Sequence, residues 1–186
     1  AMLAGAVAVG ATLWIWGQPL ISTSGHIELW VNSIWSRENS QQIADWYTLS
    51  HIIHGMALVV IGRALQRWVA FQVVVWAAII TGAGWEIAEH TDLVLDQFRG
   101  QTIYQGYIGD SVLNAICDYL FMLAGFFLAN SIPTGWAVAV ILCLEIISAT
   151  VARDSLLLTT LRVLHPIEAI SDWQDETNPV AHPRPP

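Results

Sequence analysis

The chain has 186 residues, of which 55% are hydrophobic and only 12% charged, and its mean hydropathy is +0.53. A soluble domain carries roughly 25% charged residues, so this composition favours a chain whose solvent is lipid. The net charge is −8 and every basic residue is an arginine. Nucleic acid is therefore excluded as a partner, because binding to its phosphates requires a basic patch.

Five apolar segments follow one another, and each predicts a transmembrane helix, since a span needs roughly 20 residues. The first segment, from Ala1 to about Leu20, lacks the basic start of a signal peptide, so we expect an uncleaved span. The second segment is the least apolar and contains His51 and His54. The expected spans cover residues 1–20, 43–65, 68–90, 110–130 and 134–152.

The connections between these spans differ in polarity. Residues 21–50 and Thr91 to Gly109 are polar, and the second of these segments contains three glycines. Pro133 lies in the tight turn before the last span, where a proline costs no helical hydrogen bond. Beyond the last span, Ser155–Leu164 is expected to be an amphipathic helix at the membrane interface. Residues 172–186 form a polar, proline-rich tail that we expect to be loosely ordered.

The predicted fold is an all-α integral membrane protein. Residues 1–171 form a single transmembrane domain, a bundle of about five transmembrane helices with a C-terminal interfacial amphipathic helix. One membrane face receives the short hairpin with Arg63 and Arg67, which the positive-inside tendency places in the cytoplasm. The polar segments lie on the other face, and other arginines, among them Arg37, Arg99, Arg153 and Arg162, lie there too. We therefore expect a bacterial inner-membrane protein with its polar face in the periplasm. That face receives residues 21–54, 86–110 and those beyond 152.

Polar side chains with metal-binding or acid–base chemistry gather at this polar face. Within each group the spacing of three or four residues puts the side chains on one side of a helix. Imidazoles and carboxylates on facing helices are what a bundle uses to hold Zn²⁺, Mn²⁺ or iron, and they also supply general acids and bases. The groups are His51 with His54, Glu86 with Glu89 and His90, Asp110 with Asn114 and Asp118, and Arg153 with Asp154.

The depth of some of these residues favours a functional site. His54 and Asp118 lie near the middle of their expected spans, and Glu145 lies well inside the last one. A charge at the centre of a membrane helix costs on the order of 3 kcal/mol, so such residues usually face a cavity. The candidate catalytic residues are Glu86, Glu89, Asp110 and Asp118, and the candidate ligands of a divalent metal ion are His51, His54, Glu86 and Asp118.

Each group also has a purely structural interpretation that the sequence leaves open. The two histidines fit interfacial imidazoles bonded to the backbone, and the acidic end of the third span fits a solvated helix end. Asp118 with Asn114 fits a buried hydrogen-bond network. Glu145 fits a buried partner of an arginine or a protonated carboxyl. The roles of His165 and Glu168 are also open. The two cysteines, Cys117 and Cys143, lie in apolar runs and are expected to pack rather than bind metal.

One stretch of the sequence, together with four later elements, resembles a known family. The stretch runs from Glu38 to Gly55 and reads Glu-Asn-Ser-Gln-Gln-Ile-Ala-Asp-Trp-Tyr-Thr-Leu-Ser-His-Ile-Ile-His-Gly. The later elements are Trp85–Glu89, Gly109–Asn114 with Asp118, Arg153-Asp154 and His165–Ile170. Over residues 20–173 the chain resembles an uncharacterised proteobacterial family of multi-pass inner-membrane proteins, domain of unknown function 2585.

The resemblance implies a membrane location and no assigned activity. The chain departs from the family at Ser22-Thr23-Ser24-Gly25, where the family carries a Cys-x-Cys-Gly element, so any metal or redox role of those thiols is absent here. The spacing of the Trp-Glu-x-x-Glu, Gly-Asp, Asn and Asp elements is also loosely similar to that of VanZ-like small membrane proteins.

Two functions of different classes are compatible with the sequence. In the first, the polar cluster binds a divalent metal ion or works as acid and base on a lipid or lipid-linked substrate, with the glycine-containing segment 91–109 as a lid. In the second, the chain is an accessory or assembly subunit of a larger respiratory or photosynthetic membrane complex, with small-residue faces for helix contacts. A transporter is a weaker third alternative, because the two halves show no inverted repeat.

Overall fold

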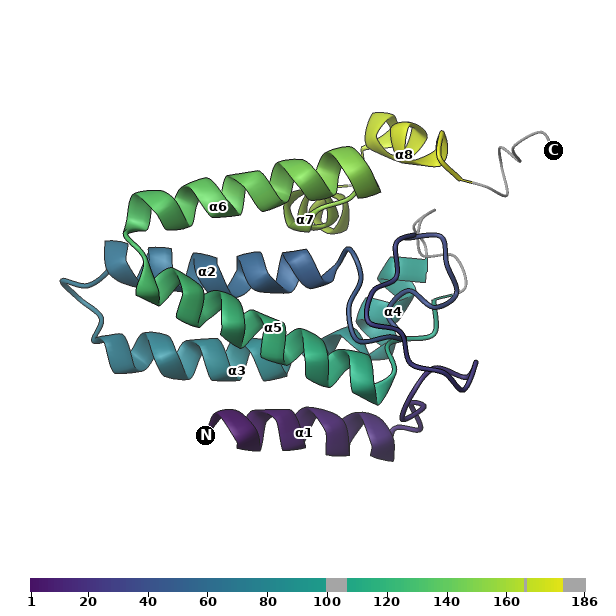
Figure 1. Ribbon diagram of the computed structural model, residues 1–186, viewed down its shortest axis with the longest axis horizontal. Coiled ribbons are helices and arrows are strands. Elements are labelled where there is room, and N and C mark those ends of the chain that lie inside the picture. The colour runs from purple at the N-terminus through teal and green to yellow at the C-terminus, as the bar shows by residue number, and fades with distance from the viewer. Residues whose placement is uncertain (100–106, 166, 179–186) are drawn as a thin grey trace.

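In the computed structural model, residues 1–99, 107–165 and 167–178 are described, and they form helices and irregular segments with no strand (Figure 1). The expectation of an all-helical fold is therefore confirmed. The helices are α1 (Met2–Ile15), α2 (Thr48–Ala64), α3 (Phe71–Glu89), α4 (Asp92–Arg99), α5 (Val112–Ser131), α6 (Thr134–Ile147), the π-helical turn η2 (Ser148–Ala152), α7 (Leu156–Leu164) and α8 (Glu168–Asp175).

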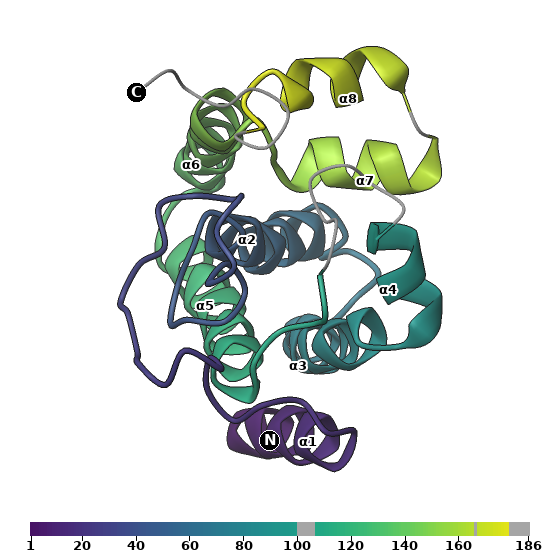
Figure 2. The ribbon, with the colours of Figure 1, turned by 90° about the vertical axis from the view of Figure 1, so that its right-hand side faces the viewer.

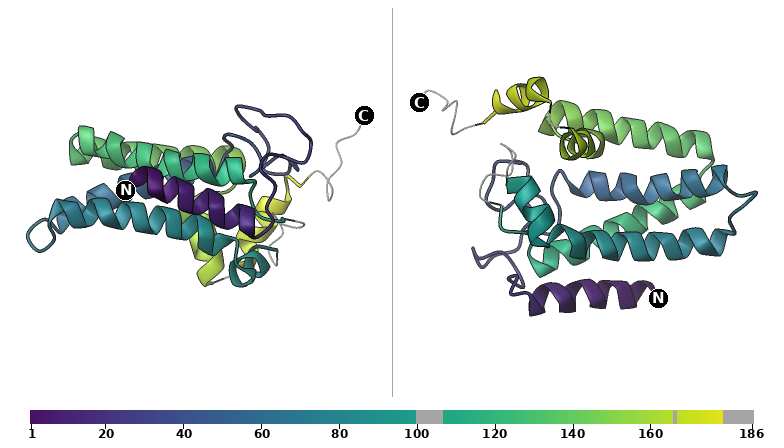
Figure 3. Two further views of the ribbon diagram at one scale, coloured as in Figure 1. Left: turned by 90° about the horizontal axis from the view of Figure 1, so that it is seen from below. Right: turned by 180° about the vertical axis from the view of Figure 1, so that it is seen from behind.

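Five of these helices form an elongated bundle. α6, α2, α3 and α1 lie in rows across the molecule, and α5 crosses α2 and α3 at an angle (Figures 1 and 3). The core at their centre contains Met56 from α2 and Tyr119, Met122 and Phe126 from α5. The N-terminus lies at the end of the bundle opposite the long segment between α1 and α2 (Figure 1).

The crossing of α2 and α5 depends on two reciprocal glycines. A Cβ on Gly55 would overlap the carbonyl oxygen of Met122, and a Cβ on Gly125 would overlap the carbonyl oxygen of Ile52. Small residues let two helix backbones approach closely, which is how helices pack in a membrane, where apolar surface alone gives little preference for helix over lipid. The two glycines therefore hold the two central helices together and fix the distance between the residues that each carries at the polar end.

Within the described residues, three segments are long and apolar enough to cross a membrane: α3, α5, and α6 together with η2. α1 and α2 coincide with the first and second expected spans but are shorter apolar helices of 14 and 17 residues.

At the far end of the bundle, the Arg63 guanidinium donates hydrogen bonds to the carbonyl oxygens of Ile132 (2.9 Å) and Asn130 (3.1 Å). It thereby pairs carbonyls that the end of α5 leaves without helical partners.

Two segments differ from the sequence-based expectation. The segment from Thr91 to Gly109 is not wholly a loop, because residues 92–99 form α4, whose first turn contains Asp92, a favourable residue at a helix start. Gly100 and Gly106 lie outside the described residues. α8 extends to Asp175 and therefore includes the first residues of the predicted tail. Residues 179–186 of that tail also lie outside the described part.

α7 coincides with the expected amphipathic helix and is capped by the Ser155 hydroxyl, which accepts from the Leu158 amide (3.3 Å).

The irregular segment between α1 and α2 covers the polar end of the bundle (Figure 2). Its residues 40–42 run beside the start of α5. The Ser111 amide donates to the carbonyl oxygen of Ser40 (3.1 Å), and the Asn114 side-chain amide donates to that of Gln42 (2.8 Å). The Gln41 side-chain amide donates to the carbonyl oxygen of Gly109 (2.9 Å). These bonds close the end of the bundle over the acidic side chains of α3 and α5.

Candidate functional site

A cavity of about 290 Å³ lies at this polar end, between the helix ends, the 40–47 segment and α7. Of the residues predicted to form the site, five line the cavity directly and a sixth, Glu86, lies in the acidic cluster at its wall. The sequence-based grouping of these residues at one end of the bundle is therefore what the structure shows. The five residues that line the cavity are His51, His54, Glu89, Asp110 and Asp118.

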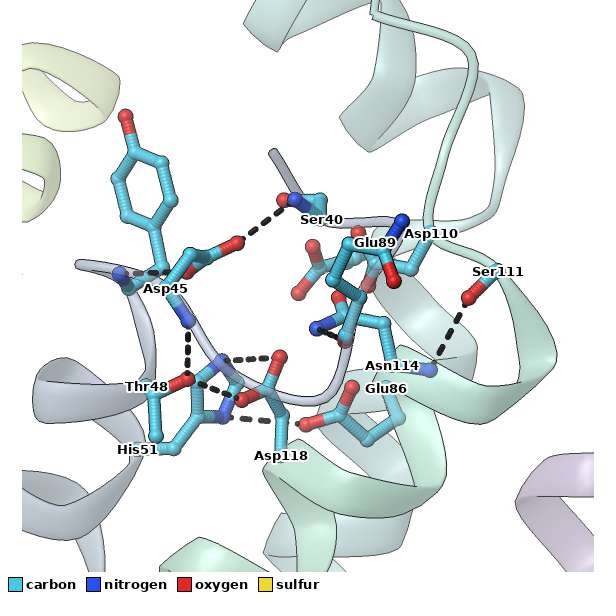
Figure 4. A network of polar contacts seen from close by, with 12 residues as sticks. Ser40, Asp45, Thr48, His51, Glu86, Glu89, Asp110, Ser111, Asn114 and Asp118 are labelled. Carbon is cyan, nitrogen blue, oxygen red and sulfur yellow. Dashed lines mark hydrogen bonds and ion pairs between the residues drawn. The ribbon is translucent and has the colours of Figure 1, made fainter. Parts of the chain in front are cut away.

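Three carboxylates meet at one wall of the cavity. Glu86 and Glu89 come from the last turn of α3, and Asp110 lies just before α5. One carboxylate oxygen from each of the three lies within 4.8 Å of the others (Figure 4). Glu86 and Asp110 are almost fully buried, with 1% and 3% of their surface exposed. Burial raises the pKa of the Asp110 carboxyl above its ordinary value, because the charged form loses its hydration.

Tyr107 joins the two carboxylates that face the cavity. Its hydroxyl is within hydrogen-bond distance of a Glu89 oxygen (3.1 Å) and of an Asp110 oxygen. A phenol has one proton to donate, so both contacts are hydrogen bonds only when one of the two carboxyls carries a proton. Burial and the nearby Asp110 charge raise the pKa of the Tyr107 hydroxyl, so the proton stays on the phenol.

His90 joins the end of α3 to the loop that carries Asp110. The Asp110 amide donates to the Nε2 atom of His90 (2.8 Å), so this nitrogen is an acceptor. The Nδ1 atom, 2.7 Å from the carbonyl oxygen of Glu86, must then carry the proton and donate it. Gly109 leaves room for the ring: it has a φ of +93°, and a Cβ there would lie 2.7 Å from the ring carbon Cδ2.

His51 lies between two acids. Its Nδ1 atom is 3.2 Å from a Glu86 oxygen, and its Nε2 atom is 3.9 Å from an Asp118 oxygen (Figure 4). The other oxygen of Asp118 accepts from the Thr48 hydroxyl (3.1 Å), and that hydroxyl accepts from the Asp45 amide (3.0 Å). An unbroken series of polar contacts therefore runs from the irregular segment to the acidic wall.

Asp45 and Tyr107 were not among the predicted site residues. The Asp45 carboxylate is 1% exposed and accepts from the amides of Ser40 (2.6 Å) and Tyr47 (2.8 Å). Burial nonetheless raises its pKa above the ordinary value of 3.8. A sequence signal for Asp45 existed, since an aspartate with Thr48 three residues later is typical of a helix start. No such signal marked Tyr107, which depends on contacts with distant helices.

Four other residues that the sequence analysis singled out do not line the cavity. Arg153 was expected at the polar face, and its guanidinium is directed to the C-terminal helix rather than to the acidic cluster. The residue has a left-handed backbone (φ 56°), its guanidinium bonds to the Trp173 carbonyl and to Glu176 (2.6 Å), and it stacks on the Trp173 ring 5.1 Å from the centroid. Glu145 accepts from the Leu157 amide (3.4 Å) at the start of α7 rather than pairing with an arginine. His165 and Glu168 are exposed at the α7–α8 connection.

The charge of the site is unbalanced. Five carboxyls lie together, and the chain has no lysine. Among the ion pairs of the described side chains, those that involve these acids use imidazoles and no guanidinium. Two buried acceptor atoms of the site, Glu86 Oε2 and Asn114 Oδ1, have no hydrogen-bond donor among the described residues. Leaving a buried acceptor unpaired costs about 1–3 kcal/mol, so the arrangement suits an added cation. The five acids are Asp45, Glu86, Glu89, Asp110 and Asp118.

The tightest acidic set differs from the predicted metal ligands. It consists of Glu86, Glu89 and Asp110, all of which offer oxygen. Oxygen donors suit Mg²⁺, Mn²⁺ or Ca²⁺ better than Zn²⁺. Both His51 nitrogens face carboxylate oxygens, and His54 lies one helical turn further along the cavity wall. The metal role predicted for these two histidines and Asp118 stays a prediction.

Comparison with known proteins places the chain in a family. The chain is 40% identical over 170 residues to a UPF0314 protein of Sphingopyxis alaskensis, an alignment that covers 89% of this chain and 88% of the relative. A UPF0314 protein of Paracoccus denitrificans is 39% identical over 170 residues (90% and 88%), and one of Rhizobium etli is 38% identical over 168 residues (90% and 86%). No solved structure matches the chain. The model of the family described as "Protein of unknown function (DUF2585)" matches residues 13–176, and the chain therefore belongs to this family.

Proposed function

We propose that this protein is a multi-pass inner-membrane enzyme that uses a divalent cation, held by oxygen ligands at the polar end of the bundle, to act on a lipid or lipid-linked substrate. One observation carries the proposal. Glu86 is 1% exposed and its Oε2 atom has no hydrogen-bond donor, while oxygens of Glu89 and Asp110 lie within 4.8 Å. A cation in this position would pair the orphan oxygen and offset the charge of all three acids.

The membrane part of the proposal is supported by where the apolar side chains lie. Large apolar residues are exposed along the outer faces of several helices, among them Leu3 of α1, Leu120 of α5 and Leu142 and Ile146 of α6. Contiguous apolar surface of this kind is costly in water and favourable in lipid. With the Arg63 hairpin in the cytoplasm, the cation site would face the periplasm.

The cation would supply Lewis acidity, which polarises a carbonyl or phosphoryl oxygen and lowers the pKa of bound water. Glu86, Glu89 and Asp110 would hold it. Asp118 lines the cavity and would take a proton from a reacting hydroxyl or water. His51, with Nδ1 3.2 Å from Glu86 and Nε2 3.9 Å from Asp118, would stabilise these two carboxylates. Leu156 of α7 gives the same cavity an apolar side, which suits a substrate with a lipid portion.

Cation binding is the first test. The protein purified in a neutral detergent would be loaded with Mn²⁺, desalted and analysed for bound metal, with Mg²⁺, Ca²⁺ and Zn²⁺ as competitors. We expect about one Mn²⁺ per chain. At a site made of oxygen ligands Mg²⁺ and Ca²⁺ should compete with Mn²⁺, whereas a site that contains nitrogen ligands would favour Zn²⁺. Glu86→Gln should weaken binding at least about tenfold, because one charged ligand is lost.

A matched control separates binding from folding. Glu145→Gln changes a carboxylate on a neighbouring helix that lies outside the acidic cluster, so it should bind Mn²⁺ like the unmodified protein. Absence of bound Mn²⁺ at millimolar concentrations in a folded, monodisperse sample would overturn the proposal. A second chain that co-purifies at fixed stoichiometry, without metal, would instead support an accessory subunit of a larger respiratory or photosynthetic complex.

A further inference from the structure

We infer that the substrate of this cavity is an amphiphile whose headgroup carries a positively charged ammonium, and that the headgroup enters the cavity while its alkyl chain stays outside, beside α7. The inference rests on the proposed function, since it names the substrate class of the same site. Three features of the cavity carry it: its charge, its aromatic walls and its size.

The five carboxyls around the cavity outnumber the two charges of one divalent cation. Glu89, Asp110 and Asp118 line the cavity directly, with Glu86 and Asp45 buried behind them. Anionic headgroups are normally recognised by arginine and lysine. Among the side chains that the structure describes, no arginine lines the cavity; Arg63 caps α5 at the opposite end and Arg153 is bound to α8. Asp118 lines the cavity outside the tight oxygen cluster, so a ligand can approach it without displacing the metal ion.

The aromatic walls add a second attraction for a cation. Tyr47, Trp85 and Tyr107 come from three different segments and all line the cavity. An ammonium over an aromatic face is attracted by the negative face of the ring, and a site with several aromatics is how proteins bind quaternary ammonium groups. Trp85 lies directly before Glu86 on α3, so the ring and the acidic wall are contributed by the same helical turn.

The size of the cavity separates the headgroup from the chain. Its volume of about 290 Å³ is at the lower limit of small-molecule sites, which hold compact ligands. A headgroup fits, whereas a long alkyl chain must extend beyond the cavity. Leu156 lines the cavity from α7, and Leu157, the next residue, is 60% exposed. α7 therefore offers an apolar path from the cavity to its surroundings.

The test compares two amphiphiles of equal chain length in neutral maltoside micelles. Binding of radiolabelled dodecyltrimethylammonium and of dodecyl phosphate would be measured by equilibrium gel filtration, with Mn²⁺ content determined on the same samples. We expect about one ammonium probe per chain at saturation and dodecyl phosphate at least about tenfold weaker. Trp85→Leu should weaken ammonium binding about fivefold, and Asp118→Asn at least about tenfold.

A variant on the same helix controls for adsorption of the probe to an acidic protein. Trp76→Leu removes an exposed tryptophan outside this cavity and should leave binding unchanged. If Asp118→Asn does not fold, Trp85→Leu still tests the inference. Trp85 is 41% exposed, so its replacement should leave the fold intact. Equal or stronger binding of dodecyl phosphate, or ammonium binding that Trp85→Leu leaves unchanged, would overturn the inference.

The metal content keeps this test separate from that of the proposed function. Bound Mn²⁺ with a preference for dodecyl phosphate would overturn the inference and leave the cation site intact. Ammonium binding at the wild-type cavity without any bound Mn²⁺ would support the inference and overturn the metal-dependent activity.

Discussion

His90 accepts the amide proton of Asp110 on one ring nitrogen and donates to the carbonyl oxygen of Glu86 from the other. The ring thus bridges the backbones of two acids that lie 24 residues apart in the chain. Because the His90 side chain is fully buried and Glu86 and Asp110 are almost fully buried, both backbone groups are shielded from water. The geometry of the acidic wall therefore depends on a histidine that does not line the cavity.

Replacing this histidine should destabilise the fold and disorganise the cation site. His90→Leu leaves two buried backbone groups without partners, at a cost of about 1–3 kcal/mol each. We expect a lower thermal midpoint in detergent, together with weaker Mn²⁺ binding. His26→Leu is the matched control, since the His26 side chain is exposed and pairs with Glu28, which is exposed as well. A thermal midpoint equal to that of the control would show that the bridge is unimportant.

The contact between α2 and α5 gives a packing prediction. Gly55→Ala places a methyl group against the Met122 carbonyl oxygen and must push the two helices apart, so the thermal midpoint should fall. Gly84→Ala is the control on α3, where a Cβ meets nothing within 4 Å, and alanine there should be neutral or stabilising. The reverse order of the two midpoints would contradict the close helix crossing.

The contributions of two acids of the irregular segment to the stability of the fold should change with pH in opposite directions. Burial raises the pKa of Asp45 above 3.8, so its contribution to stability is greatest below that pH and is lost as the pH rises through the raised value. Glu38 accepts hydrogen bonds from Ser22 and from Gln42, which lower its pKa below 4.5, so its contribution is present above 4.5 and is lost as the pH falls.

Thermal midpoints measured with a metal chelator between about pH 3 and pH 8 check both signs. Asp45→Asn should reduce the loss of stability at rising pH, and Glu38→Gln should reduce the loss at falling pH. If the thermal midpoints of the two variants changed with pH in the same way, the opposite effects of Asp45 and Glu38 on stability would be refuted.

The contacts of Arg153 predict a local effect on α8. Arg153→Ala removes the hydrogen bonds to Trp173 and Glu176 and the stacking on the Trp173 ring. We expect faster amide hydrogen exchange over residues 168–178 with Mn²⁺ binding unchanged, because the side chain lies outside the acidic cluster. Arg67→Ala at the opposite end is the control. A loss of Mn²⁺ binding in Arg153→Ala would show that this arginine contributes to the cation site.

Much of the helical architecture was predictable because it follows from local sequence. Apolar runs and helical spacing identified the helices now seen as α1, α2, α3, α5, α6 and α7. The spacing of Glu86 and Glu89 placed both acids on one side of α3. α4 was missed because its eight residues are too few to show a sustained helical period between the polar residues that flank it. Its existence depends on the turn at Thr91 that starts it, where the Thr91 hydroxyl donates to the Ala88 carbonyl oxygen (2.5 Å).

The membership of the site was decided by tertiary structure. A sequence shows which residues share a helix face, but not which face of one helix meets which loop. Asp45 and Tyr107 enter the site through bonds to Ser40, Glu89 and neighbouring segments, whereas the left-handed turn at Arg153 sends its side chain to α8. Spacing along a helix is fixed by its 3.6-residue period, whereas contacts between distant segments depend on packing and on pairing every buried polar group.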